Sequence, residues 1–176
     1  MSVGSSLAPA VTELGQRLRD AGYTVAVAES CTGGLLGAAL TDAPDASQTF
    51  LGGAVVYTPE MKTRVLGVDP RTLASKGAVS RQTAEQMATR VAERFGADLG
   101  LSVTGVAGPS PEEGKPVGLC YVAGWLRGQR RVKELRFGGG RASNRIACVE
   151  AALDLGLELL GAPAVAGRDG SQAGPA

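Results

Sequence analysis

The chain has 176 residues, of which 44% are apolar and 20% charged, enough to bury the core of one domain of ordinary size. Eighteen basic and 17 acidic residues leave a formal net charge of +1, so no overall field draws the protein to nucleic acid or an anionic membrane. Histidine is absent, which excludes Ser-His-Asp and Cys-His catalysis and His-ligated metal centres. Proton transfer near neutral pH must therefore use a carboxylate, lysine, tyrosine or cysteine.

The cysteines and the start of the chain bear on the cellular compartment. Cys31, Cys120 and Cys148 form an odd set without a C-x-x-C pair, which disfavours a disulfide framework or a zinc knuckle. No Lys- or Arg-led apolar segment opens the chain, and its uncharged runs are shorter than the roughly 18 to 20 residues that span a membrane. We expect a cytoplasmic protein that is not exported.

One domain is expected over residues 9–161. Residues 1–8 and 162–176 consist mainly of small residues and proline without periodic apolar positions, which predicts disordered ends. Apolar residues at helical spacing predict a first helix that ends at Gly22, and a β-branched run predicts a strand over 23–28. A small, apolar stretch predicts a helix over 33–43, and a strand follows over 53–57.

The second half of the chain completes an alternating pattern. Thr58-Pro59-Glu60 is typical of a helix start, with an N-cap hydroxyl, a proline and an acid, so we predict a helix to about Leu66. Further helices are predicted over 80–95 and 141–160, with strands over 99–104, 117–125 and 132–137. This order predicts a three-layer α/β/α sandwich on a mixed, mostly parallel sheet. Ligands in such sheets bind beyond the carboxyl ends of parallel strands, here at 29–34, 57–62 and 104–109.

Ser30 is a candidate nucleophile at the first of these strand ends. A strand-to-helix turn offers unpaired N–H groups that can stabilise an oxyanion or phosphate, and Gly33 and Gly34 allow close approach to the backbone. A helix N-cap is the alternative role for Ser30 or Thr32. Cys31 is a rival nucleophile, but no histidine is present to generate its thiolate, and we expect a buried, inert thiol.

Lys62 is the matching candidate base. With Thr58 as N-cap, Tyr57 and Lys62 occupy the two positions that meet in a hydrophobic staple, so we expect the phenol and amine to lie side by side. The helix start and partial burial should lower the pKa of Lys62, although a solvated surface lysine is the alternative. Without histidine, Ser30 with Lys62 is the standard nucleophile and base pair that the sequence permits.

The sequence lacks the common cofactor-binding motifs and has one local cluster of basic residues. The sequence has no S-x-x-K, P-loop or G-x-G-x-x-G pattern, and no cofactor or metal is predicted. Seven basic residues lie between 127 and 145, and among them Arg141 and Arg145 share one face of a helix start, where they could hold a phosphate. Stacking aromatics are not interleaved with them, so nucleic acid is not expected as a partner.

Six ordered segments resemble the C-terminal domain family of the competence/damage-inducible protein CinA. They are A-E-S-C-T-G-G-L at 28–35, V-V-Y-T-P-E-M-K at 55–62, G-A-V-S at 77–80, T-G-V-A-G-P at 104–109, K-P-V-G at 115–118 and F-G-G-G-R-x-x-x-R at 137–145. The resemblance implies an α/β/α fold and homo-oligomers, dimeric or larger. For stand-alone members it implies metal-independent hydrolysis of nicotinamide mononucleotide to nicotinate mononucleotide and ammonia.

The resemblance also assigns roles to residues. The family's nucleophilic serine falls on Ser30, its active-site lysine on Lys62 and its active-site tyrosine on Tyr57, while Thr104 and Gly105 match a pocket loop. The family usually has Tyr-Ser-Asn and Gly-Asp-Arg where this chain has residues 57–59 and 139–141, and the loop at 110–114 lacks the customary double glycine. These departures leave a second hypothesis open, a non-catalytic module that binds pyridine nucleotides or another protein.

Overall fold

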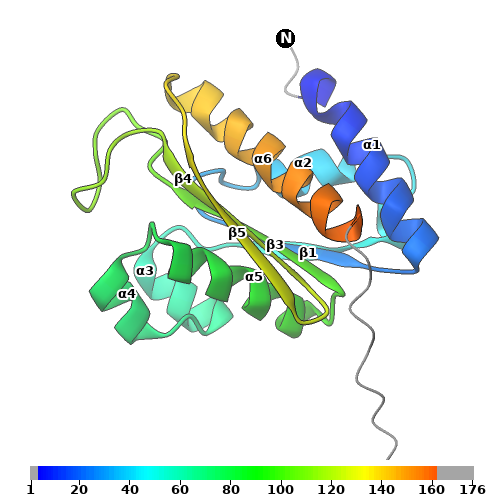
Figure 1. Ribbon diagram of the computed structural model, residues 1–176, viewed down its shortest axis with the longest axis horizontal. Helices are drawn as coiled ribbons and strands as arrows, with labels where there is room; N and C mark the ends of the chain where they lie inside the picture. The colour runs from blue at the N-terminus through cyan, green and yellow to red at the C-terminus, as the bar shows by residue number, and fades with distance from the viewer. Residues whose placement is uncertain (1–3, 162–176) are drawn as a thin grey trace, which may run out of the picture.

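A five-stranded mixed sheet forms the centre of the computed structural model, which describes residues 4–161 (Figure 1). The strands are β1 (Val25–Glu29), β2 (Phe50–Val55), β3 (Leu99–Gly105), β4 (Leu119–Leu126) and β5 (Gln129–Arg136), in the spatial order β2-β1-β3-β4-β5. β1 pairs in parallel with β2 and β3, whereas β4 is antiparallel to both β3 and β5. Every strand except β4 therefore runs in the same direction.

Helices cover both faces of the sheet. The first layer holds α1 (Gly4–Ala21), α2 (Leu35–Thr41) and α6 (Arg141–Gly161), and the second holds α3 (Pro59–Met61), α4 (Pro70–Lys76) and α5 (Arg81–Phe95) (Figure 1). A 3₁₀ turn (Ala46–Gln48) precedes β2, and a π turn (Lys62–Leu66) continues α3. The three-layer α/β/α sandwich expected from the sequence is confirmed.

The middle of the sheet is buried on both sides. All residues of β1 and β3 are buried, as expected for strands that are covered by helices on both faces. Gly100 in β3 allows α5 to lie against the sheet, since a Cβ there would be 2.0 Å from the carbonyl oxygen of Ala88. This close contact secures the strand whose carboxyl end contributes to the pocket described below.

Several predicted element bounds differ from the structure; for example, β5 begins at Gln129, three residues before the predicted start. Residues 4–8 were assigned to a disordered end but begin α1, because Leu7, only 2% exposed, extends the buried stripe of Val11, Leu14 and Leu18. β2 begins three residues earlier than expected, at Phe50. Helix α4 is not among the predicted elements, although its start at Asp69-Pro70 repeats the signal seen at residues 58–59, an N-cap side chain followed by proline.

The remaining terminal predictions fall on residues 1–3 and 162–176, which lie outside the described residues. Over residues 4–161, no helix combines the length and the apolar composition that crossing a membrane requires.

Candidate active site

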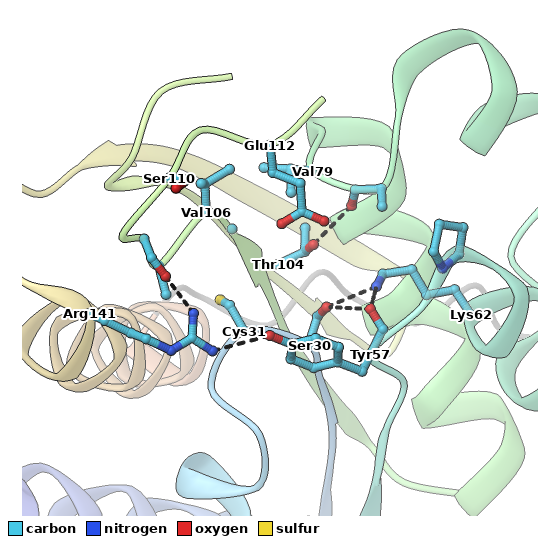
Figure 2. Close-up of a pocket in the computed structure, with 15 residues that line it drawn as sticks. Ser30, Cys31, Tyr57, Lys62, Val79, Thr104, Val106, Ser110, Glu112 and Arg141 are labelled. Carbon is cyan, nitrogen blue, oxygen red and sulfur yellow. Dashed lines mark hydrogen bonds between the residues drawn. The ribbon is translucent and has the colours of Figure 1, made fainter. Parts of the chain in front are cut away.

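The three strand ends singled out in the sequence meet at one pocket. Because β1, β2 and β3 run in parallel, the segments that follow or end them converge at the same edge of the sheet. The pocket has a volume of about 470 Å³, including the part open to solvent. It is lined by Ser30, Cys31, Tyr57, Pro59, Lys62, Ala78, Val79, residues 104–108, Ser110, Glu112 and Arg141 (Figure 2).

Ser30 lies in a tight turn directly after β1. Its backbone N–H donates to the carbonyl of Val103 at 3.0 Å, and its own carbonyl accepts from the N–H of Gly33 at 3.1 Å. The Ser30 side chain is held on the pocket floor and is 7% exposed. The bond to Val103 joins the candidate nucleophile to the neighbouring strand β3, and the bond from Gly33 closes the turn.

Glu29 anchors the same turn from beneath. Its carboxylate is 1% exposed and accepts three backbone hydrogen bonds, from Gly34 at 3.0 Å, Leu36 at 3.0 Å and Gly37 at 2.8 Å. The three N–H groups belong to the start of α2, where helix N–H groups have no partner within the helix. A buried carboxylate thus links the end of β1 to α2 around Ser30.

Lys62 is brought to the pocket by a short helix start. The Thr58 side chain accepts from the N–H of Met61 at 3.2 Å and Pro59 occupies the first turn, as the sequence predicted. The π turn that begins at Lys62 ends at Gly67 in the left-handed conformation. Together these features turn the Lys62 side chain back under the end of β2.

The Lys62 amine is fully buried and makes three hydrogen bonds. Nζ donates to Ser30 Oγ at 2.8 Å, to the Val56 carbonyl at 2.9 Å and to the Tyr57 carbonyl at 3.3 Å. Figure 2 shows the amine and the Ser30 hydroxyl directed toward one another. Burial lowers the pKa of Lys62 from 10.5 to about 8, against the opposing effect of nearby negative groups that include Glu112 and Glu113. The amine therefore loses its proton at a much lower pH than an exposed lysine does.

The Tyr57 side chain does not lie beside the Lys62 amine as the staple geometry predicted. Val56 is buried and Tyr57 is 56% exposed, because successive side chains of an extended backbone point in opposite directions. Lys62 bonds to the backbone carbonyl of Tyr57, whereas the Tyr57 phenol accepts from Arg141 at 3.2 Å. Tyr57 therefore forms part of the pocket wall through its ring.

Arg141 and Arg145 do not act as one pair. Arg141 lines the pocket and donates to the carbonyl of Gly108 at 2.6 Å as well as to the Tyr57 phenol. Arg145 is half-buried outside the pocket lining and donates to the carbonyl of Thr32 at 2.7 Å. The two guanidinium groups therefore have separate partners, and Arg141 alone reaches the pocket.

Of the other predicted binding residues, some line the pocket and some do not. Thr104 and Gly105 line the pocket. The Thr104 hydroxyl donates to the Ala78 carbonyl at 2.8 Å, and a Cβ on Gly105 would lie 2.8 Å from the Leu119 carbonyl oxygen. Thr32, Gly33 and Gly34 are not part of the lining; they shape the turn behind Ser30.

All three cysteines are free and buried in the same hydrophobic cluster. The expected burial of Cys31 is confirmed, although its side chain borders the pocket next to Ser30. Among residues 4–161 no group of histidine, cysteine or acidic side chains is arranged to hold a metal ion.

Two supporting residues were missed by sequence reasoning. Asn144, 1% exposed, donates to the carbonyls of Ala107 and Gly139 at 3.1 and 2.9 Å, which fastens the pocket loop to the start of α6. Glu113 accepts from the N–H groups of Ala78 and Val79 at 3.0 and 3.3 Å. Asn144 could have been singled out from the sequence, because it is a polar side chain between Arg141 and Arg145 near a predicted helix start. No local sequence pattern indicates the partners of Glu113.

Comparison with known proteins shows the family of the chain. The CinA C-terminal domain matches residues 7–160, nearly all of the described chain. The chain belongs to the CinA C-terminal domain family. A competence-damage inducible protein of Desulforamulus reducens is 53% identical over 149 residues, which are 84% of this chain and 36% of that protein.

Solved CinA structures agree with the fold. The competence damage-inducible protein A of Klebsiella pneumoniae has a TM-score of 0.84 at 34% identity, covering 87% of this chain and 96% of that one. A competence/damage inducible protein of Agrobacterium tumefaciens has a TM-score of 0.79 at 42% identity, covering 86% and 95%. In contrast, the chain spans about a third of the length of the curated CinA relatives it matches.

Proposed function

We propose that this CinA domain is a serine amidohydrolase that converts nicotinamide mononucleotide to nicotinate mononucleotide and ammonia. The observation that carries the proposal is the buried Lys62 amine at 2.8 Å from the Ser30 hydroxyl. The reaction type follows from this pair in a chain that lacks histidine. The choice of nucleotide follows from the resemblance of the six sequence segments to nicotinamide-nucleotide amidohydrolases.

The hydrogen bonds of Lys62 suit a general base. A neutral amine has two N–H groups and one lone pair. The carbonyls of Val56 and Tyr57 can accept both N–H groups, which leaves the lone pair for the Ser30 hydroxyl. The two backbone carbonyls thus orient the neutral amine so that its lone pair points toward the Ser30 hydroxyl.

Acylation would proceed with Ser30 Oγ attacking the carboxamide carbon while its proton passes to Lys62 Nζ. The tetrahedral intermediate then collapses, the C–N bond breaks, and Lys62 returns the proton to the departing nitrogen, which leaves as ammonia. Water next attacks the ester carbon and gives a proton to Lys62. Release of the acid restores the Ser30 hydroxyl with that proton.

Backbone N–H groups of the Ser30 turn are suited to hold the oxyanion. Within residues 4–161, the N–H groups of Cys31 and Thr32 donate to no backbone carbonyl, in contrast to those of Ser30 and Gly33. A donor next to the nucleophile is the usual position for stabilising a tetrahedral oxyanion. Arg141, which lines the same pocket, offers a positive charge to the nucleotide phosphate.

The direct test is ammonia release from nicotinamide mononucleotide, with product identity checked by chromatography. Rapid-quench kinetics should show a covalent acyl group on Ser30 when hydrolysis of the ester is the slower step. Release of ammonia by the parent protein but not by Ser30→Ala would support the proposal, and no release by the parent would contradict it.

A non-catalytic nucleotide-binding module is the second candidate. The observation that favours it is Pro59, which lines the pocket at the position where the family usually has an asparagine and offers no hydrogen-bonding side chain. Calorimetric binding of nicotinamide mononucleotide in the absence of any ammonia release would select this alternative.

A further inference from the structure

The segment over residues 108–117 contributes Gly108, Ser110 and Glu112 to the pocket lining. Glu113 accepts backbone bonds from Ala78 and Val79 in the segment before α5, and the Lys115 amine donates to Glu113 at 3.0 Å and to the carbonyl of Lys76 at 2.9 Å. Glu112 and Lys115 also exchange backbone hydrogen bonds at 3.2 and 2.8 Å. The loop is therefore held at its tip, and the backbone position of Glu112 is defined.

This anchoring places the Glu112 carboxylate on the pocket. Glu112 belongs to the pocket lining, and Figure 2 shows its carboxylate reaching down toward Thr104. Within the described residues, no side chain donates a hydrogen bond or pairs with this carboxylate, in contrast to Glu113. Glu112 is thus an exposed acid at the edge of the ligand space, without a hydrogen-bonded side-chain partner among residues 4–161.

The pocket presents charged groups of both signs to a ligand, the Lys62 amine and Arg141 being positive and Glu112 negative. Arg141 contributes a positive group beside Tyr57, while Glu112 contributes a negative group from the loop on the other side (Figure 2). A ligand that complements both carries an anionic group and a cationic group. Nicotinamide mononucleotide has this character, since its phosphate is anionic and its pyridinium ring is permanently cationic.

We propose that Glu112 is a specificity-determining residue that faces the cationic ring of the substrate, so that the enzyme prefers pyridinium nucleotides to analogues with an uncharged ring. This inference rests on the proposed amidase function. Glu112 would distinguish a cationic ring from an uncharged one by its charge. The Ser30–Lys62 pair cannot do so, because it acts on the carboxamide, which both kinds of ring carry.

The test compares oxidised and reduced nicotinamide mononucleotide. The two share the carboxamide, ribose and phosphate, and they differ in ring charge. In Glu112→Gln, kcat/KM for the oxidised nucleotide should fall about five- to tenfold, while the value for the reduced nucleotide changes less than about twofold. Glu112→Asp, which retains the charge, should keep most of the preference.

Glu60→Gln is the matched control. Glu60 lies two residues before Lys62, is exposed, pairs with Arg64 at 3.2 Å and is not part of the pocket lining. It should leave both kcat/KM values within about twofold of the parent. Equal losses for the two nucleotides in Glu112→Gln, or no loss for either, would overturn the assignment of Glu112.

Binding separates this inference from the proposed function. Calorimetric titration of Ser30→Ala with each nucleotide, with and without Glu112→Gln, measures ring selectivity without turnover. Selective loss of oxidised-nucleotide binding supports Glu112 even if the parent releases no ammonia, in which case only the amidase proposal fails. Unchanged selectivity, or no binding of either nucleotide, overturns the role of Glu112.

Discussion

Lys62 Nζ lies 2.8 Å from Ser30 Oγ, although the two residues are 32 positions apart and follow different strands. Their contact depends on the parallel pairing of β1 with β2, in which Glu29 is in register with Val55. Ser30 lies in the turn directly after β1 and Lys62 follows the short helix α3 after β2, and the two side chains meet in the pocket lining.

Removing either member of the pair should abolish hydrolysis. We expect Ser30→Ala and Lys62→Met each to lower kcat by on the order of 10³-fold or more, because neither group functions without the other. Methionine avoids the large cavity that alanine would leave at a fully buried position. The double variant should be no slower than the worse single variant, as measured by ammonia release with circular dichroism to verify folding.

Cys31→Ala serves as the control for this experiment, since Cys31 also borders the pocket. It should retain most of the activity. Near-normal turnover in Ser30→Ala, or a loss in Cys31→Ala as large as that in Ser30→Ala, would contradict the assignment of the nucleophile.

Activity should rise with pH along a limb centred near pH 8. The pKa of Lys62 is lowered to about 8 by burial, and the base must be neutral to accept the Ser30 proton. Below that pH the protonated fraction grows, so kcat/KM should fall about tenfold per pH unit; above it the rate should level off. A profile that is flat from pH 6 to 9 would show that Lys62 is not the base.

The two helix arginines should have different kinetic effects. Arg141→Ala should raise KM for nicotinamide mononucleotide about tenfold with little effect on the phosphate-free riboside, since Arg141 lines the pocket. Arg145→Ala should instead affect both substrates alike, because Arg145 holds the carbonyl of Thr32 in the Ser30 turn. Steady-state kinetics with both substrates separates the two roles, and a phosphate-selective effect of Arg145 would reverse the assignment.

Glu29→Gln should weaken the turn around Ser30. The buried carboxylate accepts three backbone N–H bonds, and an amide offers one oxygen together with an NH₂ group that opposes those donors. We expect a loss of about 2 kcal/mol in the free energy of unfolding, measured with urea, and a lower kcat. Unchanged stability and turnover would show that α2 holds the turn without Glu29.

The sequence predicted the architecture and the central pair better than it predicted the surrounding contacts. Hydrophobic periodicity and helix-capping residues are local features of the sequence, so the strand ends and the helix start at Thr58 could be located from the residues alone. The convergence of the strand ends follows from a general property of parallel sheets. Residue spacing therefore sufficed to propose Ser30 and Lys62 together.

Contacts between distant segments could not be derived in this way. Arg141 was paired with Arg145 on helical spacing, yet its partners are Gly108 and Tyr57, which depend on how α6 lies across two loops. Tyr57 was placed beside Lys62 by a helix rule, although the extended backbone before the helix decides where its ring points. The roles of Asn144 and Glu113 likewise rest on loop positions that no local pattern encodes.

β2 is an edge strand that pairs with β1 on one side only, so the position of Lys62 depends on an edge strand, whereas Ser30 follows the interior strand β1. If mild denaturant frays this edge first, the proton acceptor is withdrawn while the interior strands stay paired. Turnover would then disappear at denaturant concentrations where the circular dichroism spectrum is still unchanged. Under the proposed function, loss of turnover would therefore report fraying of one sheet edge before the fold as a whole is lost.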